Sequence, residues 1–247
     1  MLKEKSANEI FVKKVDGKPG LTTSIIVPAY NEEEGLPVVL EKIFNNINGV
    51  HEVLVIDDGS HDATSKVACR FPCNVIRHKV NRGKGEALKT GVRYAKGDNI
   101  LFIDSDDTYP ADALPVMTEA LISYDLVYGS RTYGRENIPR FNQFGNYMFQ
   151  SMMRGIYGFQ ATDYATGLYG LKKVHWEKMQ VSSNGFSIEP EVALKASRMK
   201  LRVKDIPIKY GARLGATKLG SFKAGYEHLK TILGHAFWRP VHETKEG

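Results

Sequence analysis

The most constraining feature of this sequence is a pair of acids, Asp104 and Asp106, directly after the apolar run 99–103. A short apolar run is typical of a buried strand, and polar side chains emerge where such a strand ends. Side chains alternate along an extended chain, so both carboxylates are expected on one side. Two neighbouring carboxylates require a positive partner, and a hard divalent cation that also binds phosphate oxygens is a natural one. The alternative is a solvated, Asp-rich turn.

Two earlier segments have the same layout, an apolar run followed by a polar loop and then helical spacing. Residues 24–28 precede the loop with Tyr30 and Glu32, and residues 53–56 precede the loop with Asp58. Continuous apolar strands that alternate with helices predict an α/β fold with a mostly parallel central sheet and helices on both faces. Ligands bind beyond the carboxyl ends of the strands in such sheets. The polar residues of the three loops are therefore expected to converge.

Taken in order, these motifs resemble the signature of family 2 inverting glycosyltransferases with the GT-A fold. The motifs are Val27–Glu32 (VPAYNE), Val55–Ser60 (VIDDGS) and Asp104–Asp106 (DSD). Further segments are similar to the dolichol-phosphate mannose synthase branch, whose members move one sugar from a nucleotide donor to a polyprenyl phosphate. These segments are Gly129–Arg131, Asp163–Gly167, Gly185–Glu191 and Arg213–Leu219.

The resemblance implies a donor site for a nucleotide-diphosphate sugar. A base and a ribose need a flat pocket and acidic acceptors, since a carboxylate makes charge-assisted hydrogen bonds. Asp57 is expected to point into the fold instead. Lys84 lies in a Gly-Lys-Gly loop without P-loop spacing, and a plain turn with a solvated lysine is its alternative. The expected donor-binding residues are Pro28, Tyr30, Glu32, Ile56, Asp58, Lys84, Asp104 and Ser105.

The resemblance also implies Mg²⁺ or Mn²⁺ between the acidic pair and the donor diphosphate, where the cation offsets like charges. Asp106 is the first candidate ligand and Asp104 the second. Family members often carry Gln two positions after the second acid, whereas this chain has Thr108 there, preceded by Asp107. Either residue can complete the coordination, so the third ligand and the preferred metal stay open.

An acceptor phosphate is already an oxyanion near neutral pH and needs positive charge rather than a strong base. Arg131 is the leading candidate because it follows a predicted strand, and an arginine offers bidentate phosphate contacts. The expected step is an in-line displacement with inversion, in which Arg131, Asp106 and Asp163 are the catalytic candidates. The resemblance implies that Asp163 is either a general base or a residue that orients an arginine or the sugar, and Glu191 is expected to contact the sugar or an arginine. The candidate acceptor-phosphate residues are Arg131, Arg140, Arg213 and Lys218.

The pattern predicts a flexible N-terminal lead-in (1–21), a GT-A domain (22–220), an amphipathic C-terminal helix (221–240) and a short tail (241–247). Residues 132–146 lack a clean period and are expected to form a mobile active-site loop before a helix at about 144–157. The apolar stripe of the C-terminal helix either packs on the core or rests on the bilayer beside a lipid acceptor. Its residues are Phe222, Tyr226, Leu229, Leu233 and Phe237.

The net charge of +6 suits anionic ligands or an anionic membrane surface. No nucleic-acid-binding motif is present in the sequence. Cys69 and Cys73 are interpreted as reduced thiols rather than as ligands of a zinc site. No signal peptide is recognisable, and no apolar run approaches the ~20 residues that span a bilayer. We expect a cytoplasmic protein at the membrane periphery, with a membrane-embedded partner subunit left open.

The leading hypothesis is a metal-dependent transfer of one hexose, from a GDP-mannose or UDP-glucose type donor, to dolichyl or undecaprenyl phosphate. The Gln-x-x-Arg-Trp signature of processive synthases is absent, which favours single-sugar transfer. The first alternative is a soluble family 2 glycosyltransferase with a sugar or small-molecule hydroxyl as acceptor. An inactive nucleotide-sugar sensor and a metal-dependent nucleotidyltransferase are the others.

Overall fold

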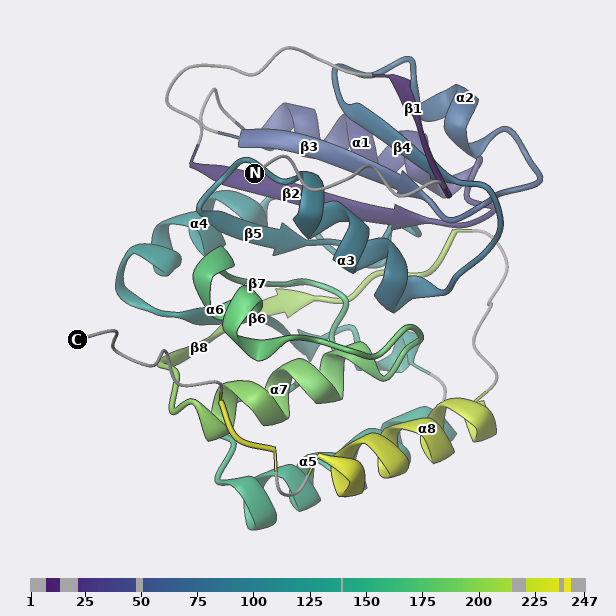
Figure 1. The fold of residues 1–247 in the computed structure, drawn as a ribbon. Helices are drawn as coiled ribbons and strands as arrows, with labels where there is room; N and C mark the ends of the chain where they lie inside the picture. The colour runs from purple at the N-terminus through teal and green to yellow at the C-terminus, as the bar shows by residue number, and fades with distance from the viewer. Residues whose placement is uncertain are drawn as a thin grey trace.

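A single eight-stranded sheet organises the chain (Figure 1). The computed structural model describes residues 8–13, 22–47, 51–138, 140–214, 221–235 and 238–240. The strand order is β1-β4-β3-β2-β5-β7-β6-β8. Strands β4, β3, β2 and β5 are parallel, β7 is antiparallel to both neighbours, and β6 and β8 are parallel. The strands are β1 (Glu9–Lys13), β2 (Thr23–Ala29), β3 (His51–Asp57), β4 (Asn74–His78), β5 (Asn99–Phe102), β6 (Leu126–Tyr133), β7 (Tyr169–Lys172) and β8 (Val203–Lys209).

Helices cover both faces of this sheet, as the sequence predicts. The apolar side chains of α1 (Gly35–Asn46), α2 (Thr64–Ala68) and α4 (Ala113–Ser123) pack with Ile25 and Val27 of β2. Those of α3 (Lys84–Tyr94), α6 (Lys173–Met179) and α7 (Ile188–Arg198) pack with Ile26, because neighbouring side chains of a strand point to opposite faces. Outside α7, α5 (Arg140–Tyr157) and α8 (Ser221–Gly234) lie side by side.

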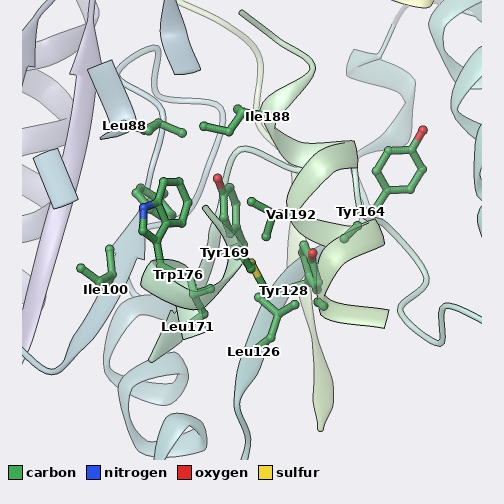
Figure 2. Close-up of a cluster of buried hydrophobic side chains, with 14 of the residues drawn as sticks. Leu88, Ile100, Leu126, Tyr128, Tyr164, Tyr169, Leu171, Trp176, Ile188 and Val192 are labelled. Carbon is green, nitrogen blue, oxygen red and sulfur yellow. The ribbon is translucent and has the colours of Figure 1, made fainter. Parts of the chain in front are cut away.

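The cluster on the α3–α7 face places α7 firmly against the sheet (Figure 2). Ile188 and Val192 of α7 are fully buried, as is Leu88 of α3. They pack in one cluster with Trp176 of α6 and Tyr169 of β7. The N-terminal turn of α7 is thereby held beside the N-terminal turn of α3, and both carry charged residues of the site described below.

The structure differs from the sequence expectations at several boundaries. Residues 9–13 of the expected lead-in form β1, whose Glu9 carboxylate accepts hydrogen bonds from Arg93 Nη1 (2.5 Å) and the Tyr94 hydroxyl (3.0 Å) of α3. The expected loop 132–146 instead contains the end of β6, a 3₁₀ turn (Arg135–Asn137) and the start of α5. The C-terminal helix ends at Gly234 rather than at residue 240. Strand β8, which contains Pro207, lies at the sheet edge, where a proline does not interrupt the hydrogen-bond ladder.

Candidate active site

The residues predicted at the strand ends converge at one edge of the sheet. Strands β3, β2 and β5 are neighbours, so their following loops lie together. Pro28 of β2 and Ile56 of β3 are buried partners in the parallel register. Glu32 is buried, whereas Tyr30 is partly exposed with its ring edge-on to His61. Tyr30 thus brings an aromatic ring, and Glu32 a carboxylate, to the ends of β2 and β3, and their donor-binding role stays a prediction.

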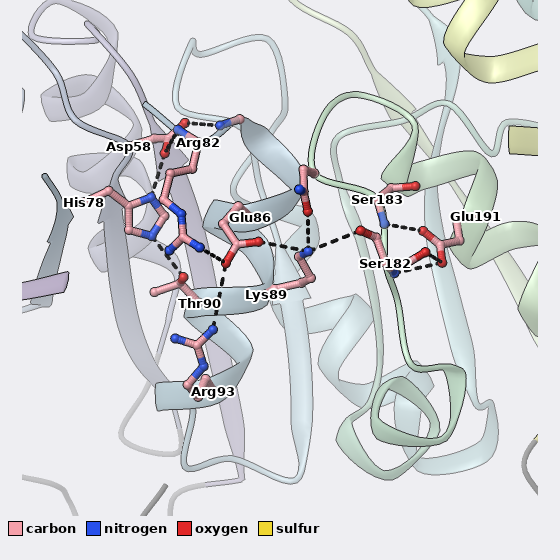
Figure 3. Close-up of polar contacts among 12 residues, drawn as sticks. Asp58, His78, Arg82, Glu86, Lys89, Thr90, Arg93, Ser182, Ser183 and Glu191 are labelled. Carbon is pink, nitrogen blue, oxygen red and sulfur yellow. Dashed lines mark hydrogen bonds and ion pairs between the residues drawn. The ribbon is translucent and has the colours of Figure 1, made fainter. Parts of the chain in front are cut away.

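Two aspartates, Asp57 at the end of β3 and Asp58 directly after it, fix the loops around the site. The Asp57 carboxylate is fully buried and accepts hydrogen bonds from Ser60 N (2.8 Å) and the Ser65 hydroxyl, which confirms that it points into the fold. Asp58 accepts from His78 Nδ1 (2.6 Å) and from the backbone N–H groups of Arg82 (2.9 Å) and Gly83 (2.8 Å) (Figure 3). Both Asp58 oxygens are therefore engaged in ordering the loop that leads to Lys84.

Lys84 forms an ion pair with Asp104, the first of the two acids. Its Nζ lies 2.7 Å from Asp104 Oδ1 and 2.8 Å from Glu189 Oε1, at the start of α7. The plain turn with a solvated lysine is thus wrong. Burial raises the pKa of Asp104 to about 6, although Lys84 opposes the shift. Glu189 was not predicted as a site residue, because nothing in the sequence distinguishes it within the 185–191 segment, in which only Glu191 was singled out.

The second acid is held by a different cation. Arg213 donates to Asp106 Oδ2 (2.6 Å) from Nη1 and to Glu32 Oε1 (2.8 Å) from Nη2. Arg213 was expected at the acceptor phosphate, but two buried carboxylates draw its guanidinium to the donor side instead. The Thr108 hydroxyl donates to Asp106 Oδ1 (2.6 Å), so it supports this carboxylate rather than standing free as a metal ligand. Asp107 turns away to Lys42 (2.6 Å).

The acidic pair has the ligand chemistry of a divalent-cation site, since carboxylate oxygens are the hard ligands that Mg²⁺ prefers. In the structure Lys84 and Arg213 occupy these carboxylates, and among the described residues no group of three or more His, Cys, Asp or Glu side chains is arranged to hold a metal ion. Arg213 Nε is buried without a hydrogen-bond partner among the described residues, so the guanidinium is incompletely satisfied where it lies. A backbone approach also shapes the site, since a Cβ at Gly167 would lie 2.0 Å from Asp104 Oδ2.

A buried ion pair lies at the end of β6. Arg131 donates from Nε to Asp163 Oδ2 (2.6 Å) and from Nη2 to Oδ1 (2.7 Å), and its backbone N–H also reaches Asp163 (3.1 Å). Burial alone would raise the pKa of Asp163, but the hydrogen bonds from Arg131 bring it below its ordinary value. This geometry favours the orienting role of Asp163 over that of a general base.

Aromatic residues link the ion pair to the acidic pair. The Arg131 guanidinium lies 5.5 Å from the centre of the Tyr210 ring, and Tyr210 packs edge-on against Tyr109 at 5.2 Å. The Tyr109 hydroxyl accepts a hydrogen bond from Gly167 N (2.7 Å), the glycine that faces Asp104. Arg131 and Asp104 are therefore joined by a chain of side-chain and backbone contacts through Tyr210, Tyr109 and Gly167.

A cavity of about 100 Å³ opens beside Arg131, between the end of β6 and α5. Arg135 lines it and donates from Nε to the Arg131 carbonyl oxygen (2.7 Å). Sequence reasoning missed Arg135 because the surrounding residues lack a period. Arg140 is the first residue of α5, and its side chain lies outside the described part of the structure, as does all of Lys218.

Glu191 does not join the site, contrary to expectation. It is fully buried in α7, and its carboxylate accepts hydrogen bonds from Ser182 N (2.9 Å) and Ser183 N (2.7 Å) (Figure 3). Lys195 Nζ lies 2.5 Å from the same carboxylate. The position of Glu191 one turn into α7 directs it to the loop before the helix rather than to the acidic pair. Among the described residues its partners are therefore Lys195, His235 and the loop before the helix rather than an arginine.

Comparison with known proteins agrees with this geometry. The sequence profile described as glycosyl transferase family 2 matches residues 24–177, which hold the acidic pair, Arg131 and Asp163. The chain belongs to glycosyl transferase family 2. It is a glycosyltransferase with the GT-A fold, as the motifs predicted, whereas Glu191 and Arg213 lie beyond the matched region.

Two archaeal relatives and one solved structure illustrate the similarity. The dolichyl-phosphate hexose transferase of Haloferax volcanii is 29% identical over 85% of this chain and 92% of its own length. The dolichol-phosphate mannosyltransferase of Pyrococcus furiosus is 27% identical over 88% of this chain and 64% of its own length. Glucosyl-3-phosphoglycerate synthase from Mycobacterium tuberculosis, solved with Mn²⁺, UDP and glucosyl-3-phosphoglycerate, has a TM-score of 0.70 at 21% identity, with 88% of this chain and 80% of that one covered. The last likeness concerns the fold alone.

Proposed function

We propose that this glycosyltransferase moves one hexose, from a GDP-mannose or UDP-glucose type donor, to a polyprenyl phosphate with inversion. The observation that carries the proposal is the Arg131–Asp163 pair, with its adjoining cavity and Arg135, close to a separate acidic pair suited to a diphosphate and a cation. Two anionic substrates need two such regions. The names of the Haloferax and Pyrococcus relatives support a dolichyl phosphate type of acceptor.

The reaction is a single displacement. An oxygen of the acceptor phosphate forms a bond to the anomeric carbon, and the bond from that carbon to the donor's β-phosphate oxygen breaks. The electron pair leaves with the nucleoside diphosphate. A phosphate monoester has its second pKa near 6, so the nucleophile is already ionised at neutral pH. Asp163 can then remain on Arg131, while Arg131 and Arg135 hold the acceptor phosphate through charge-assisted contacts.

The acidic pair would hold Mg²⁺ or Mn²⁺ on the donor side, where a divalent cation offsets the charge of the leaving diphosphate. The Mn²⁺ and UDP bound in the Mycobacterium tuberculosis structure support this assignment. With a cation on Asp106, the Arg213 guanidinium, which pairs with Asp106 and Glu32 in the structure, would be free to contact a phosphate instead.

Nucleotide release tests the proposal. The purified chain is mixed with GDP- and UDP-sugars and Mn²⁺ or Mg²⁺, with and without a short polyprenyl phosphate. Release of a nucleoside diphosphate that requires one donor and the lipid is the expected result. Release without the lipid would indicate hydrolysis or a hydroxyl acceptor, and release of pyrophosphate would indicate a nucleotidyltransferase; both contradict the proposal.

We also infer that the outer face of α5 and α8 rests on an anionic membrane surface. No described helix is long and apolar enough to cross a bilayer. On α8, Ile232 is buried against the core, yet Tyr226 and Leu233 are 67% and 56% exposed. On the adjacent α5, Tyr147 is 74% exposed. Helix α8 therefore packs on the core through Ile232 and also presents Tyr226 and Leu233 outward, a pattern that suits an interfacial position.

Basic residues accompany these apolar ones. Arg154 of α5 and Lys230 of α8 are both exposed, and each basic residue near an anionic surface adds about 1 kcal/mol of attraction. Of the predicted stripe, the Phe222 side chain and all of Phe237 lie outside the described residues.

Leu233→Glu is expected to weaken binding to phosphatidylglycerol vesicles several-fold, because it places a negative charge at the apolar contact. Co-sedimentation with vesicles measures the effect. Ile122→Glu is the matched control, since Ile122 is 78% exposed on α4, which packs on the opposite face of the sheet. Equal losses for both variants, or none for Leu233→Glu, would contradict the assignment.

A further inference from the structure

A short loop, 182–184, links the core of α7 to the lysine of the donor site. One side of this loop is held by Glu191, whose Oε1 accepts from Ser182 N (2.9 Å) and Ser182 Oγ (3.0 Å) and whose Oε2 accepts from Ser183 N (2.7 Å) (Figure 3). A fully buried carboxylate that receives three hydrogen bonds from one short loop strongly restricts the path of that loop.

The other side of the 182–184 loop packs on the two glycines that flank Lys84. A Cβ at Gly83 would lie 2.5 Å from the Asn184 carbonyl oxygen, and a Cβ at Gly85 would lie 2.4 Å from the Ser183 carbonyl oxygen. These distances are too short for any side chain at Gly83 or Gly85, so the backbone of the 182–184 loop packs directly on the backbone of both glycines. Glu86 N also donates to the Asn184 carbonyl (3.2 Å), at the first turn of α3.

Further hydrogen bonds join the loop to α3. Lys89 Nζ reaches the Asn184 side-chain oxygen (2.5 Å) and the Ser182 carbonyl (3.3 Å) (Figure 3). The loop is thus fastened to α7 on one side and to α3 on the other. Lys84 begins α3, and its Nζ lies between Asp104 and Glu189 at 2.7 and 2.8 Å.

The C-terminal segment reaches the same carboxylate. His235, just after α8, places Nε2 3.4 Å from Glu191 Oε1. Lys195 Nζ lies 2.5 Å from that oxygen and 5.1 Å from the centre of the Trp238 ring. A continuous set of contacts therefore runs from His235 and Trp238 through Lys195, Glu191 and the 182–184 loop to Lys84.

We propose that Glu191 is a positioning residue of the donor site, and that the C-terminal segment steadies the donor site through it. The carboxylate fixes the 182–184 loop, the loop fixes the glycines on each side of Lys84, and Lys84 is thereby held on Asp104. His235 and Trp238 complete the set by restricting Glu191 and Lys195. The inference rests on the proposed function only in taking Lys84 and Asp104 as donor-binding residues.

Hydrogen exchange on the full chain without any ligand tests whether the C-terminal segment restricts the 182–184 loop through Glu191. His235→Ala removes one partner of Glu191 at a partly exposed position and leaves the buried core intact. The expected result is faster exchange in peptides that cover 82–88 and 181–187, with β3 and α1 unchanged. Lys230→Ala, an exposed change on the same helix, is the control. Faster exchange confined to α8 would overturn the inference.

Nucleotide affinity tests the functional part, with UDP and GDP in the presence of Mn²⁺ as probes in calorimetry. The nucleotide that wild type binds should bind His235→Ala roughly 3-fold more weakly and Glu191→Gln about 10-fold more weakly, as expected for lost hydrogen bonds to a charged group. In steady-state assays the donor KM should rise while kcat at saturating donor stays within about 2-fold, a split that a general loss of fold does not produce. Glu177→Gln, on the exposed face of α6, is the matched control.

The outcomes separate the two proposals. If wild type binds neither nucleotide while the exchange coupling is present, the proposed function fails and the positioning network stands. If wild type binds a nucleotide and both variants bind it equally well, Glu191 has no positioning role at the donor site and the inference is overturned.

Discussion

Asp106→Asn is expected to lower kcat by about 10³-fold or more, since a bound cation contributes several kcal/mol of charge stabilisation to a leaving diphosphate. In the structure one Asp106 oxygen faces Arg213 and the other accepts from Thr108. The neutral amide keeps the size of the side chain but loses the charge that a metal requires. Turnover with the lipid acceptor measures the first effect, and Mn²⁺ binding in the presence of nucleotide, followed by electron paramagnetic resonance, measures the second.

The neighbouring residue supplies a matched control. Asp107→Asn changes the same functional group one position away, where the carboxylate pairs with a half-exposed Lys42. An exposed pair of this kind contributes little. The positive φ of Asp107 (62°) is also one that asparagine readily adopts. Near-normal turnover of Asp107→Asn together with inactive Asp106→Asn supports the metal assignment, and full activity of Asp106→Asn would refute it.

Arg131→Lys is expected to reduce kcat/KM for the lipid phosphate by about 10²-fold, while the donor affinity changes little. Lysine keeps the positive charge but cannot make the two parallel hydrogen bonds that Arg131 makes to Asp163. The misplaced charge then stabilises the incoming phosphate poorly. Removal of one hydrogen-bond donor that stabilises transition-state charge costs roughly 10²–10³-fold in rate. Initial rates against acceptor concentration at saturating donor give the measurement.

Arg202→Lys provides the comparison, because Arg202 makes the same bidentate contact to Asp125 (3.1 Å for both bonds) on an exposed surface. Its turnover should match wild type. The double variant Arg131→Lys/Asp163→Asn should lose less than the sum of the two single losses, since the two residues act as one unit. A defect in Arg131→Lys that appears only as weaker donor binding would exclude its role at the acceptor.

The fold and the convergence of polar side chains at the strand ends follow from local pattern. Apolar runs ending in Tyr30, Glu32, Asp58 and the acidic pair were sufficient to predict parallel strands and a shared edge, because strand character and side-chain alternation are properties of adjacent residues. The inward-pointing Asp57 was predicted on the same basis, and the structure confirms it. Residues 132–146 were predicted wrongly because a short 3₁₀ turn and the start of α5 leave no clear period.

The partners of the acidic residues required the tertiary structure. Arg213 reaches Asp106 across 107 positions and Glu32 across 181, and Lys84 meets Glu189 only because α3 and α7 pack on the same face of the sheet. Long-range packing also decides that Asp163 pairs with Arg131. It likewise decides that Glu191 contacts the 182–184 loop rather than the acidic pair. Local sequence specifies which chemical groups appear at strand ends. Which cation neutralises which carboxylate depends on long-range packing, because buried charges pair with whatever opposite charge the folded chain brings within a few ångströms.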